Sequence, residues 1–271
     1  MTDSSTATGG QQQEPHLDTH VPHSARVWNY WLGGKDNFAV DRELGDQIRQ
    51  VYPDIVEVAR TARGFLVRAV RYLVDEAGIR QFLDIGTGLP TANNTHEVAQ
   101  SIAPECRIVY VDNDPLVLVH ARALLTSSPQ GATDYIDADV RDTDRILEQA
   151  ARTLDFTKPV AIILQGILGY IPDDDEAHSI LKRLLDAVPP GSYLAIGDGT
   201  KTSEVHADVE RTAQDGGLDY HYRTPERITH LFDGLELLEP GVVPMPQWRP
   251  DLGAADAATA PAGRVGLARK P

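Results

Sequence analysis

The sequence contains very little cysteine. Cys106 is the only cysteine in a chain of 271 residues, so an intrachain disulfide cannot form. A zinc site built on several thiolates is excluded for the same reason, and we predict no metal site. Because a free cysteine behaves as a small hydrophobic residue and Cys106 precedes an apolar run, we expect its side chain to be buried.

Long hydrophobic runs are also missing. No stretch approaches the roughly 20 apolar residues that a membrane-spanning helix needs. The first residues lack the basic and apolar regions of a signal peptide, because they are mainly Ser, Thr, Gly and Gln. We therefore expect a cytoplasmic protein, with residues 1–20 forming a disordered tail that has little to bury.

Basic residues are scarce relative to acidic ones. The chain has 25 Lys and Arg against 40 Asp and Glu, which gives a formal net charge of -15. A surface of this sign repels phosphate backbones and anionic lipids. We expect no nucleic-acid partner and no membrane partner, although a local basic patch remains compatible with this balance. The oligomeric state does not follow from the sequence.

Apolar periodicity predicts helices over residues 21–78. Helical spacing begins near Ser24 and stops at Gly33 and Gly34. Asp36 is the expected N-cap of a second helix, which runs to about Gln50. A third helix is expected from about residue 54 to residue 76, with one apolar stripe along its length.

From residue 79 onward, short apolar strands alternate with helices. The expected strands cover residues 81–85, 107–111, 133–136, 160–164, 192–196, 235–238 and 263–268. The helix between the first two strands is expected over residues 91–102. Such alternation predicts βαβ units, with the last two strands forming an antiparallel hairpin at the sheet edge. Residues 244–261 are rich in Pro, Ala and Asp and are expected to form a long loop. The predicted fold is α/β: a doubly wound, mostly parallel seven-stranded sheet over residues 79–271.

The first strand of this sheet ends in a glycine-rich turn, residues 84–88 (DIGTG). Ligands of doubly wound sheets bind outside the carboxyl ends of the strands, and glycine lets the backbone approach them closely. Such turns are common, so the motif is weak when taken alone. Asp84, Gly86, Thr87 and Gly88 are candidate ligand-binding residues.

Acidic residues follow the next two strands in the same register. Asp112 is placed to accept hydrogen bonds from both hydroxyls of a ribose, with Asn113 beside it, while Asp114 suits the cap of the following helix. Asp139 can accept from the exocyclic amine of adenine, and the backbone amide of Val140 can meet a ring nitrogen. The three strand ends together predict a site for an adenosine-containing ligand.

A dinucleotide is the competing ligand. The full G-x-G-x-x-G pattern would need glycine at position 91, where Thr91 stands. The carboxylate of Asp84 would repel a pyrophosphate but attract an ammonium group. Both observations favour S-adenosylmethionine over NAD.

These segments resemble the actinobacterial S-adenosyl methyltransferase family, which was once classed as a domain of unknown function. The resemblance runs from about Ala25 to Arg249 and rests on residues 32–38 (LGGKDNF), 82–91 (FLDIGTGLPT), 109–115 (VYVDNDP), 172–175 (PDDD) and 189–193 (PPGSY). It implies a Rossmann-like class I methyltransferase, S-adenosylmethionine as cofactor, and an N-terminal helical cap over the cofactor. The substrates of the family are largely unassigned.

The implied cap suggests further cofactor contacts. Tyr30, Lys35 and Asp36 could lie near the cofactor or the substrate, or they could be solvated residues beside a Gly-Gly helix stop. Arg63 could bind the methionine carboxylate as a bidentate partner, or it could extend to solvent. Gln165 ends the fourth strand, beside the expected methyl-transfer position.

The sequence departs from the family pattern near that position. Gly169 and Asp198 stand where histidines are common in the family, and Ala62 stands where asparagine is common. A family-typical general base is therefore in doubt. Asp198, His178 and His221 are the ionisable candidates, each better suited to a structural or solvated role, so no catalytic residue is predicted.

Three functions remain open from the sequence. The first is an S-adenosylmethionine-dependent methyltransferase acting on a small-molecule acceptor. The second is a non-catalytic, regulatory S-adenosylmethionine-binding protein, suggested by Gly169 and Asp198. The third is a nucleotide-dependent oxidoreductase, which Thr91 and Asp84 disfavour.

Overall fold

The computed structural model describes residues 18–124, 127–250 and 263–271. Most of the predicted tail and the larger part of the predicted loop at residues 244–261 therefore lie outside the described residues. Within the described ranges, no helix is long and apolar enough to cross a membrane.

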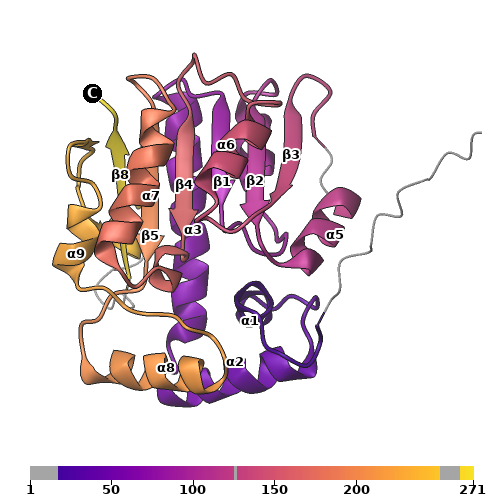
Figure 1. Ribbon diagram of the computed structural model, residues 1–271, viewed down its shortest axis with the longest axis vertical. Coiled ribbons are helices and arrows are strands. Elements are labelled where there is room, and N and C mark those ends of the chain that lie inside the picture. Colours follow the sequence, from indigo (N-terminus) through magenta and orange to yellow (C-terminus); the bar gives the residue numbers. More distant parts are fainter. Residues whose placement is uncertain (1–17, 125–126, 251–262) are drawn as a thin grey trace, which may run out of the picture.

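A single mixed sheet forms the centre of the molecule (Figure 1). Its order is β3-β2-β1-β4-β5-β8-β6, with β7 also paired to β8; β1 to β5 are parallel to one another, and β8 is antiparallel to β5. The strands are β1 Gln81–Ile85, β2 Arg107–Asp112, β3 Ala132–Asp137, β4 Ala161–Gln165, β5 Tyr193–Asp198, β6 Glu236–Leu237, β7 Val243–Pro244 and β8 Arg264–Arg269. The predicted doubly wound sheet is confirmed.

The described residues form one strand more than the predicted seven. The additional strand, β7, is only two residues long and pairs antiparallel with β8. A segment this short, ending in proline, has no recognisable alternation of apolar and polar residues. The predicted antiparallel pairing of the last two strands is confirmed, because β6 and β8 are hydrogen-bonded neighbours.

Alternation along the strands divides the core between the two faces of the sheet. In β1, Leu83 and Ile85 pack with α6 (Thr143–Ala150) and α7 (Asp174–Asp186), whereas Phe82 packs on the opposite face with α3 (Ile55–Asp75) and α4 (Thr95–Ile102). Figure 1 shows α6 and α7 in front of the sheet and α3 behind it. Successive side chains of a strand point to opposite faces, so these nearly continuous apolar strands suit a sheet covered on both sides.

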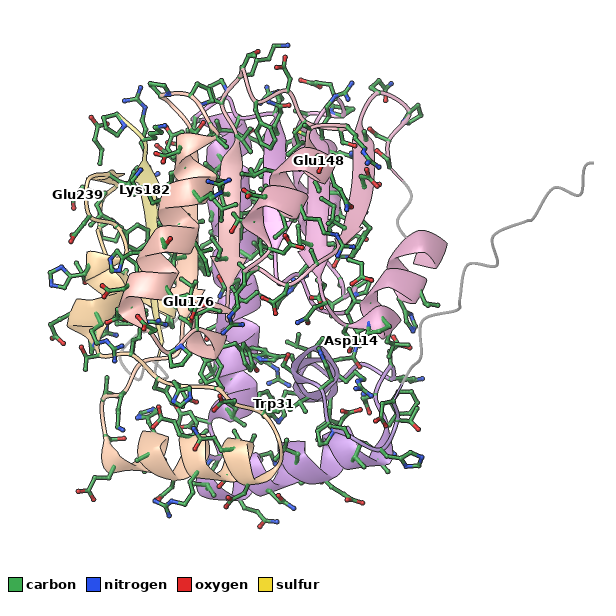
Figure 2. All side chains as sticks on the ribbon, in the orientation of Figure 1. Trp31, Asp114, Glu148, Glu176, Lys182 and Glu239 are labelled. Carbon is green, nitrogen blue, oxygen red and sulfur yellow. The ribbon has the colours of Figure 1, made fainter. Side chains whose placement is uncertain are left out.

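A layer of helices lies across the carboxyl ends of the parallel strands (Figure 1). It contains α1 (Ser24–Trp31), α2 (Ala39–Val51) and α8 (Glu204–Asp215), together with the first part of α3. Figure 2 places Trp31 within this layer. The sequence did not predict α8, because Val209 and Ala213 are its only buried hydrophobic residues. We call these elements the cap layer.

Two predicted helix starts were wrong. Asp36 is not an N-cap, because α2 begins at Ala39; the carboxylate of Asp41 instead accepts from the backbone N–H of Phe38 at 2.8 Å. The helix expected from residue 91 begins at Thr95. There the Glu97 carboxylate accepts from the backbone N–H of Asn94 at 2.8 Å. In both helices an acidic residue in the first turn fixes the start by binding an otherwise unpaired N–H.

The segment after β7 is packed more firmly than a long loop would be. Residues Met245–Gln247 form a short 3-10 helix, and the side chain of Trp248 is fully buried. The Trp248 ring meets Phe65 of α3 edge to face at 5.3 Å, and the Arg68 guanidinium donates to the carbonyl of Trp248 at 2.8 Å. This part of the predicted loop is therefore wrong, because one aromatic residue anchors the chain against α3.

The remaining elements of the described residues are two helices and one short turn. They are α5 (Pro115–Leu124), the 3-10 turn Leu168–Tyr170 and α9 (Pro225–His230). Cys106 is buried and unpaired, as expected.

Candidate functional site

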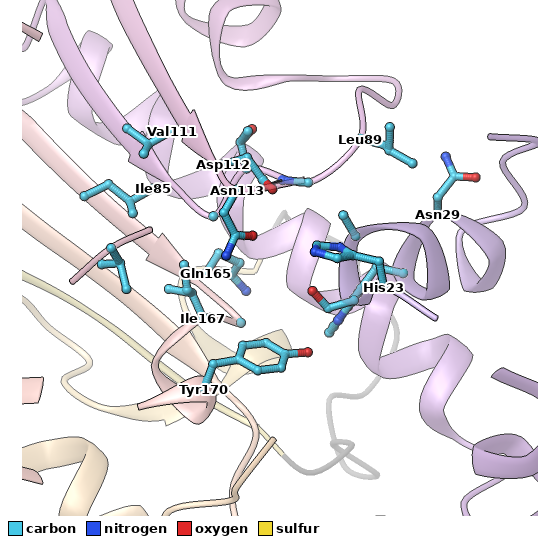
Figure 3. Close-up of a pocket in the computed structure, with 18 of the residues that line it drawn as sticks. His23, Asn29, Ile85, Leu89, Val111, Asp112, Asn113, Gln165, Ile167 and Tyr170 are labelled. Atoms are coloured by element: carbon cyan, nitrogen blue, oxygen red, sulfur yellow. Dashed lines mark hydrogen bonds between the residues drawn. The ribbon is translucent and has the colours of Figure 1, made fainter. Parts of the chain in front are cut away.

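A cavity of about 580 Å³ lies between the carboxyl ends of the strands and the cap layer. We call it the main cavity. In Figure 3, Asp112, Asn113, Gln165 and Tyr170 reach it from the sheet side, and His23 faces them from the start of α1. Ten of the residues predicted from the sequence line it: Arg63, Asp84, Gly86, Thr87, Gly88, Asp112, Asn113, Asp139, Val140 and Gln165.

The turn after β1 favours glycine at two positions. Gly86 and Gly88 have φ values of 74° and 67°, in the left-handed region. A Cβ at Gly86 would also lie 2.5 Å from Cδ1 of Ile167. The N–H of Gly86 donates to the carbonyl of Val111 at 2.8 Å, which ties the turn to β2. The backbone therefore approaches the main cavity without a side chain in between.

Asp84 is a buried carboxylate at the base of this turn. The hydroxyl of Thr95 donates to its Oδ2 at 2.6 Å. Burial raises the pKa of Asp84 to about 6, while the Thr95 hydrogen bond and the nearby Arg63 oppose this rise. Such a group gains from a cationic partner, because burial has removed the water that would stabilise its charge.

Arg63 brings a positive charge to the same end of the main cavity. Its guanidinium donates to the backbone carbonyls of Ala92 and Asn93, both at 3.2 Å. Burial lowers the pKa of Arg63, against the stabilising effect of Asp84. The side chain is thus held in place by the loop before α4 rather than extending freely into solvent.

Asp112 ends β2 with both carboxylate oxygens oriented by the backbone. Oδ2 accepts from the N–H of Gly88 at 2.8 Å, and Oδ1 accepts from the N–H of Asp114 at 2.9 Å. Its burial raises the pKa of Asp112, although these hydrogen bonds oppose the rise. One lone pair on each oxygen remains available to a ligand.

Asp139 and its neighbours form the third strand end. The backbone N–H of Arg141 donates to Oδ1 of Asp139 at 2.9 Å, and the amide of Asn113 donates to Oδ2 at 3.4 Å. Val140 is buried beside it. The guanidinium of Arg141 binds Glu176 at 2.8 Å and also lies 3.6 Å from Oδ1 of Asp139. The carboxylate of Asp139 is thus oriented but remains accessible.

Tyr30, Lys35 and Asp36 lie outside the lining of the main cavity. The hydroxyl of Tyr30 donates to the carboxylate of Asp46 at 2.9 Å. Gly33, with a φ of 80°, ends α1, as in a Gly-Gly helix stop. We therefore omit these three residues from the proposed binding site, because the helix stop directs the chain away from it.

Several lining residues were not predicted. Among them are residues of α1 and its N-cap (His23, Ser24, Trp28 and Asn29), Tyr170, and two residues of the segment after α8 (Leu218 and Asp219). No motif marks them, because they reach the cavity only through the packing of the cap layer. The one available signal was the apolar spacing of the first helix, which indicated a buried face but not its partner.

Asp114 connects the cap layer to the sheet (Figure 2). Its Oδ1 accepts from the N–H of Leu116 at 2.9 Å, which confirms its predicted role as a helix cap. Its Oδ2 lies 3.0 Å from Nδ1 of His23 and 3.4 Å from Nε of Arg26. Burial alone would raise the pKa of Asp114, but His23, the Leu116 N–H and Arg26 together hold it below its usual value. The start of α1 is thereby fastened over the main cavity.

Gly169 and Asp198, the two departures from the family pattern, belong to one structural unit. The buried carboxylate of Asp198 accepts from the N–H groups of Gly169 and Gly199, each at 2.9 Å, and from the hydroxyl of Tyr220. A Cβ at Gly169 would lie 2.2 Å from the Tyr220 ring. The tyrosine therefore fills the space that a side chain at position 169 would need.

The two candidate histidines are each paired with nearby protein groups. The ring nitrogens of His178 lie 2.7 Å from the carbonyl of Asp174 and 3.1 Å from that of His230. His221 pairs with the exposed carboxylate of Asp219 at 2.9 Å. Neither lines the cavity.

Comparison with known proteins identifies the family. The profile described as S-adenosyl methyltransferase matches residues 10–271. The chain belongs to this family. Membership confirms the resemblance seen in the sequence, together with the class of activity and the S-adenosylmethionine cofactor that it implied.

Two solved structures are similar over nearly the whole methyltransferase chain. A DUF574 family protein from Streptomyces avermitilis is 44% identical, with a TM-score of 0.91 over 94% of this chain and 100% of that one. A Thermobifida fusca protein, described provisionally as a methyltransferase, is 43% identical, with a TM-score of 0.87 over 96% of this chain and 99% of that one.

A more distant relative is a carboxy-S-adenosyl-L-methionine synthase from Citrifermentans bemidjiense. It is 25% identical over 171 residues, which cover 61% of this chain and 64% of that protein. The match spans less than two thirds of the relative's length. The reaction named for that protein is therefore not assigned to this chain.

Proposed function

We propose that this chain transfers a methyl group from S-adenosylmethionine to a small-molecule acceptor. The observation that carries the proposal is the pair of buried carboxylates, Asp84 and Asp112, on either side of the glycine turn of the main cavity. A cationic amino group and a ribose diol satisfy this donor set, whereas a pyrophosphate would be repelled by it.

The residues of the cavity fit the cofactor from one end to the other. Asp84 would receive its ammonium group and Arg63 its carboxylate, with the backbone of Gly86, Thr87 and Gly88 close beside them. Asp112 and Asn113 would receive the ribose hydroxyls. Asp139 would accept from the adenine amine, and the N–H of Val140 would meet a ring nitrogen. Gln165 would lie beside the transferred methyl group.

When bound, S-adenosylmethionine would supply a methyl group attached to a cationic sulfur. This methyl group would be transferred to a lone pair of the acceptor, and the electrons of the broken C–S bond would stay on the sulfur. The chain's own contribution is to align the acceptor and to exclude water. The contacts of Asp114 with His23 and Arg26 hold α1 over the main cavity and so help to exclude water. We assign no general base, because Asp198 already accepts three hydrogen bonds.

The cap layer supports a small acceptor. We propose that residues 21–78, together with α8, cover the α/β domain at 79–271 and enclose the main cavity. An enclosed site beneath an acidic surface suits a small neutral molecule and not a nucleic acid. We also propose that the protein acts in the cytoplasm, since neither a membrane-spanning helix nor a disulfide is found in the described residues.

Calorimetry with S-adenosylmethionine, its demethylated product and NAD tests the cofactor assignment. We expect the first two to bind and NAD not to bind. Asp112→Asn should weaken S-adenosylmethionine binding by about 1–3 kcal/mol, since hydrogen bonds to a charged group are lost. Asp134→Asn, on the exposed face of β3, is the matched control and should bind normally. Binding of NAD alone would contradict the proposal.

Catalysis needs a second assay. Protein incubated with methyl-labelled cofactor and a cell extract should transfer label to a small molecule. Label transfer would exclude a purely regulatory, non-catalytic role, whereas binding without any transfer would favour it.

A further inference from the structure

A second, smaller space adjoins the main cavity. It has a volume of about 60 Å³ and lies between the ends of β4 and β5 and the cap layer. We call it the inner chamber. It shares walls with the main cavity, including Ser24, Trp28, Gln165 and Tyr170. If the cofactor occupies the main cavity, as the proposed function requires, the inner chamber lies directly beside it.

The walls of the inner chamber are mainly apolar and aromatic. Among them are Trp28, Trp31, Tyr170, Tyr220 and Tyr222. Tyr220 contacts Tyr170 and Tyr222 edge to face, with ring centroids at 5.1 and 5.2 Å. The rings hold one another in place, so the chamber is already formed for an apolar group.

Two polar side chains of the lining, Asp198 and Gln165, differ in how far their hydrogen bonds are satisfied. Asp198 already accepts the three hydrogen bonds described above. Oε1 of Gln165, by contrast, is buried and has no hydrogen-bond partner among the described residues. A buried acceptor without a partner is costly unless a ligand supplies a donor. Gln165 lines both spaces, so this donor would lie at the boundary between them.

The side chains around the chamber offer no counter-ion to an anionic ligand. The described residues that line it include no Lys, Arg or His. The nearby Arg223 is occupied elsewhere, since its guanidinium donates to Asp174 and to the carbonyls of Leu168 and Ile171. An anion would find no counter-ion here. A protonated amine would lack the lone pair that methyl transfer requires.

We propose that the inner chamber seats the acceptor substrate: a small, uncharged, largely apolar molecule with one O–H or N–H group. The donor binds Oε1 of Gln165 at the boundary, and the apolar end enters the chamber. Because a water molecule occupies roughly 30 Å³, the chamber admits only a few heavy atoms, such as one edge of an aromatic ring. The rest of the acceptor stays in the main cavity.

Fluorine NMR titrations with 4-fluorophenol, 4-fluorotoluene and 4-fluorobenzoate test the proposal. The first two have similar shapes, but only the phenol can donate to Gln165. In Gln165→Met, which keeps the length of the side chain, we expect the preference for 4-fluorophenol over 4-fluorotoluene to fall about three- to tenfold. We expect 4-fluorobenzoate to bind more weakly than the phenol.

A second variant blocks the chamber itself. Ala213 of α8 lines the inner chamber and not the main cavity, so Ala213→Phe should abolish 4-fluorophenol binding while S-adenosylhomocysteine binds within about twofold of the parent protein. Val205→Phe places the same ring on the exposed face of α8 and should change neither. If Ala213→Phe does not fold, Gln165→Met decides alone.

The outcomes separate this proposal from the proposed function. An unchanged phenol preference in Gln165→Met, or normal phenol binding to folded Ala213→Phe, would overturn the chamber assignment even if S-adenosylhomocysteine binds. If S-adenosylhomocysteine fails to bind the parent protein while 4-fluorophenol binding changes as expected in both variants, the chamber is a ligand site but the cofactor assignment is wrong.

Discussion

The carboxylates at the strand ends differ according to the donors that surround them. Asp114 is held below its usual pKa by a histidine, an arginine and a backbone N–H, so it remains ionised and serves the structure. Asp84 has one hydroxyl donor and a raised pKa of about 6, so it is incompletely compensated. Of these two aspartates, Asp114 thus stabilises the fold, whereas Asp84 is suited to bind a cationic ligand.

Cofactor affinity should depend on the ionisation of Asp84. Its pKa of about 6 means that the carboxyl is mostly protonated at pH 5 and mostly ionised at pH 7.5. Since the ammonium of S-adenosylmethionine is attracted only to the ionised form, affinity should rise with pH across this window, by up to about tenfold. Calorimetry at several pH values measures this, and Asp84→Asn should bind more weakly with a flatter profile. An equally steep profile in Asp84→Asn would assign the dependence to another group.

Gly169 should tolerate no side chain while Tyr220 is present. We expect Gly169→Ala to lower the free energy of unfolding by about 1–3 kcal/mol, because its Cβ would overlap the tyrosine ring. Urea denaturation measures the change. Gly64→Ala in α3 is the control: its Cβ would lie 3.1 Å from Nη1 of Arg68, which needs a shift of only a few tenths of an ångström, and alanine favours the helix by about 0.5–1 kcal/mol, so we expect a smaller change than in Gly169→Ala. A neutral Gly169→Ala would show that Tyr220 can move aside.

At the scale of elements, the cap layer is assembled from opposite parts of the chain. Helices α1 and α2 precede the sheet, whereas α8 follows β5, and they share one apolar cluster with the start of α3. Helix α3 then continues along the back of the sheet. The helical segment 21–78 and the segment 79–271 therefore do not form two separate apolar cores.

The fastening of α1 should control how long the cofactor stays bound. Asp114→Asn keeps the helix cap but removes the charge that His23 and Arg26 face. We expect S-adenosylhomocysteine to dissociate several-fold faster, since the start of α1 would open more often. Stopped-flow displacement measures this rate. Asp186→Asn, which removes an exposed carboxylate paired with Lys182, should leave it unchanged; equal rates in both variants would contradict a role for this contact in closure.

The whole molecule should unfold as one unit, because α3 belongs to both the cap layer and the sheet. A ligand at 100 times its Kd stabilises the folded state by about 2.7 kcal/mol. For a protein of this size we expect S-adenosylhomocysteine at that concentration to raise Tm by roughly 5–10 °C in a single transition. Scanning calorimetry measures both. Two transitions, of which only one shifts, would show that the cap layer unfolds independently.

The sequence by itself determined the sheet and one side of the site. The glycine turn, Asp112 and Asp139 each follow a strand, and parallel neighbouring strands place their carboxyl ends on the same edge. This is why their convergence on the main cavity could be predicted from register alone. The helix starts at Ala39 and Thr95 could not, because each depends on which acidic side chain turns back to the backbone.

Only the tertiary structure decided the other side of the site. His23, Tyr170, Leu218 and the inner chamber arise from contacts between segments that are distant in the chain and carry no local motif. It also explained Gly169 and Asp198, which appeared in the sequence as separate departures. They form one unit because Tyr220 packs against the first and donates to the second, a relation that depends on folding and not on spacing.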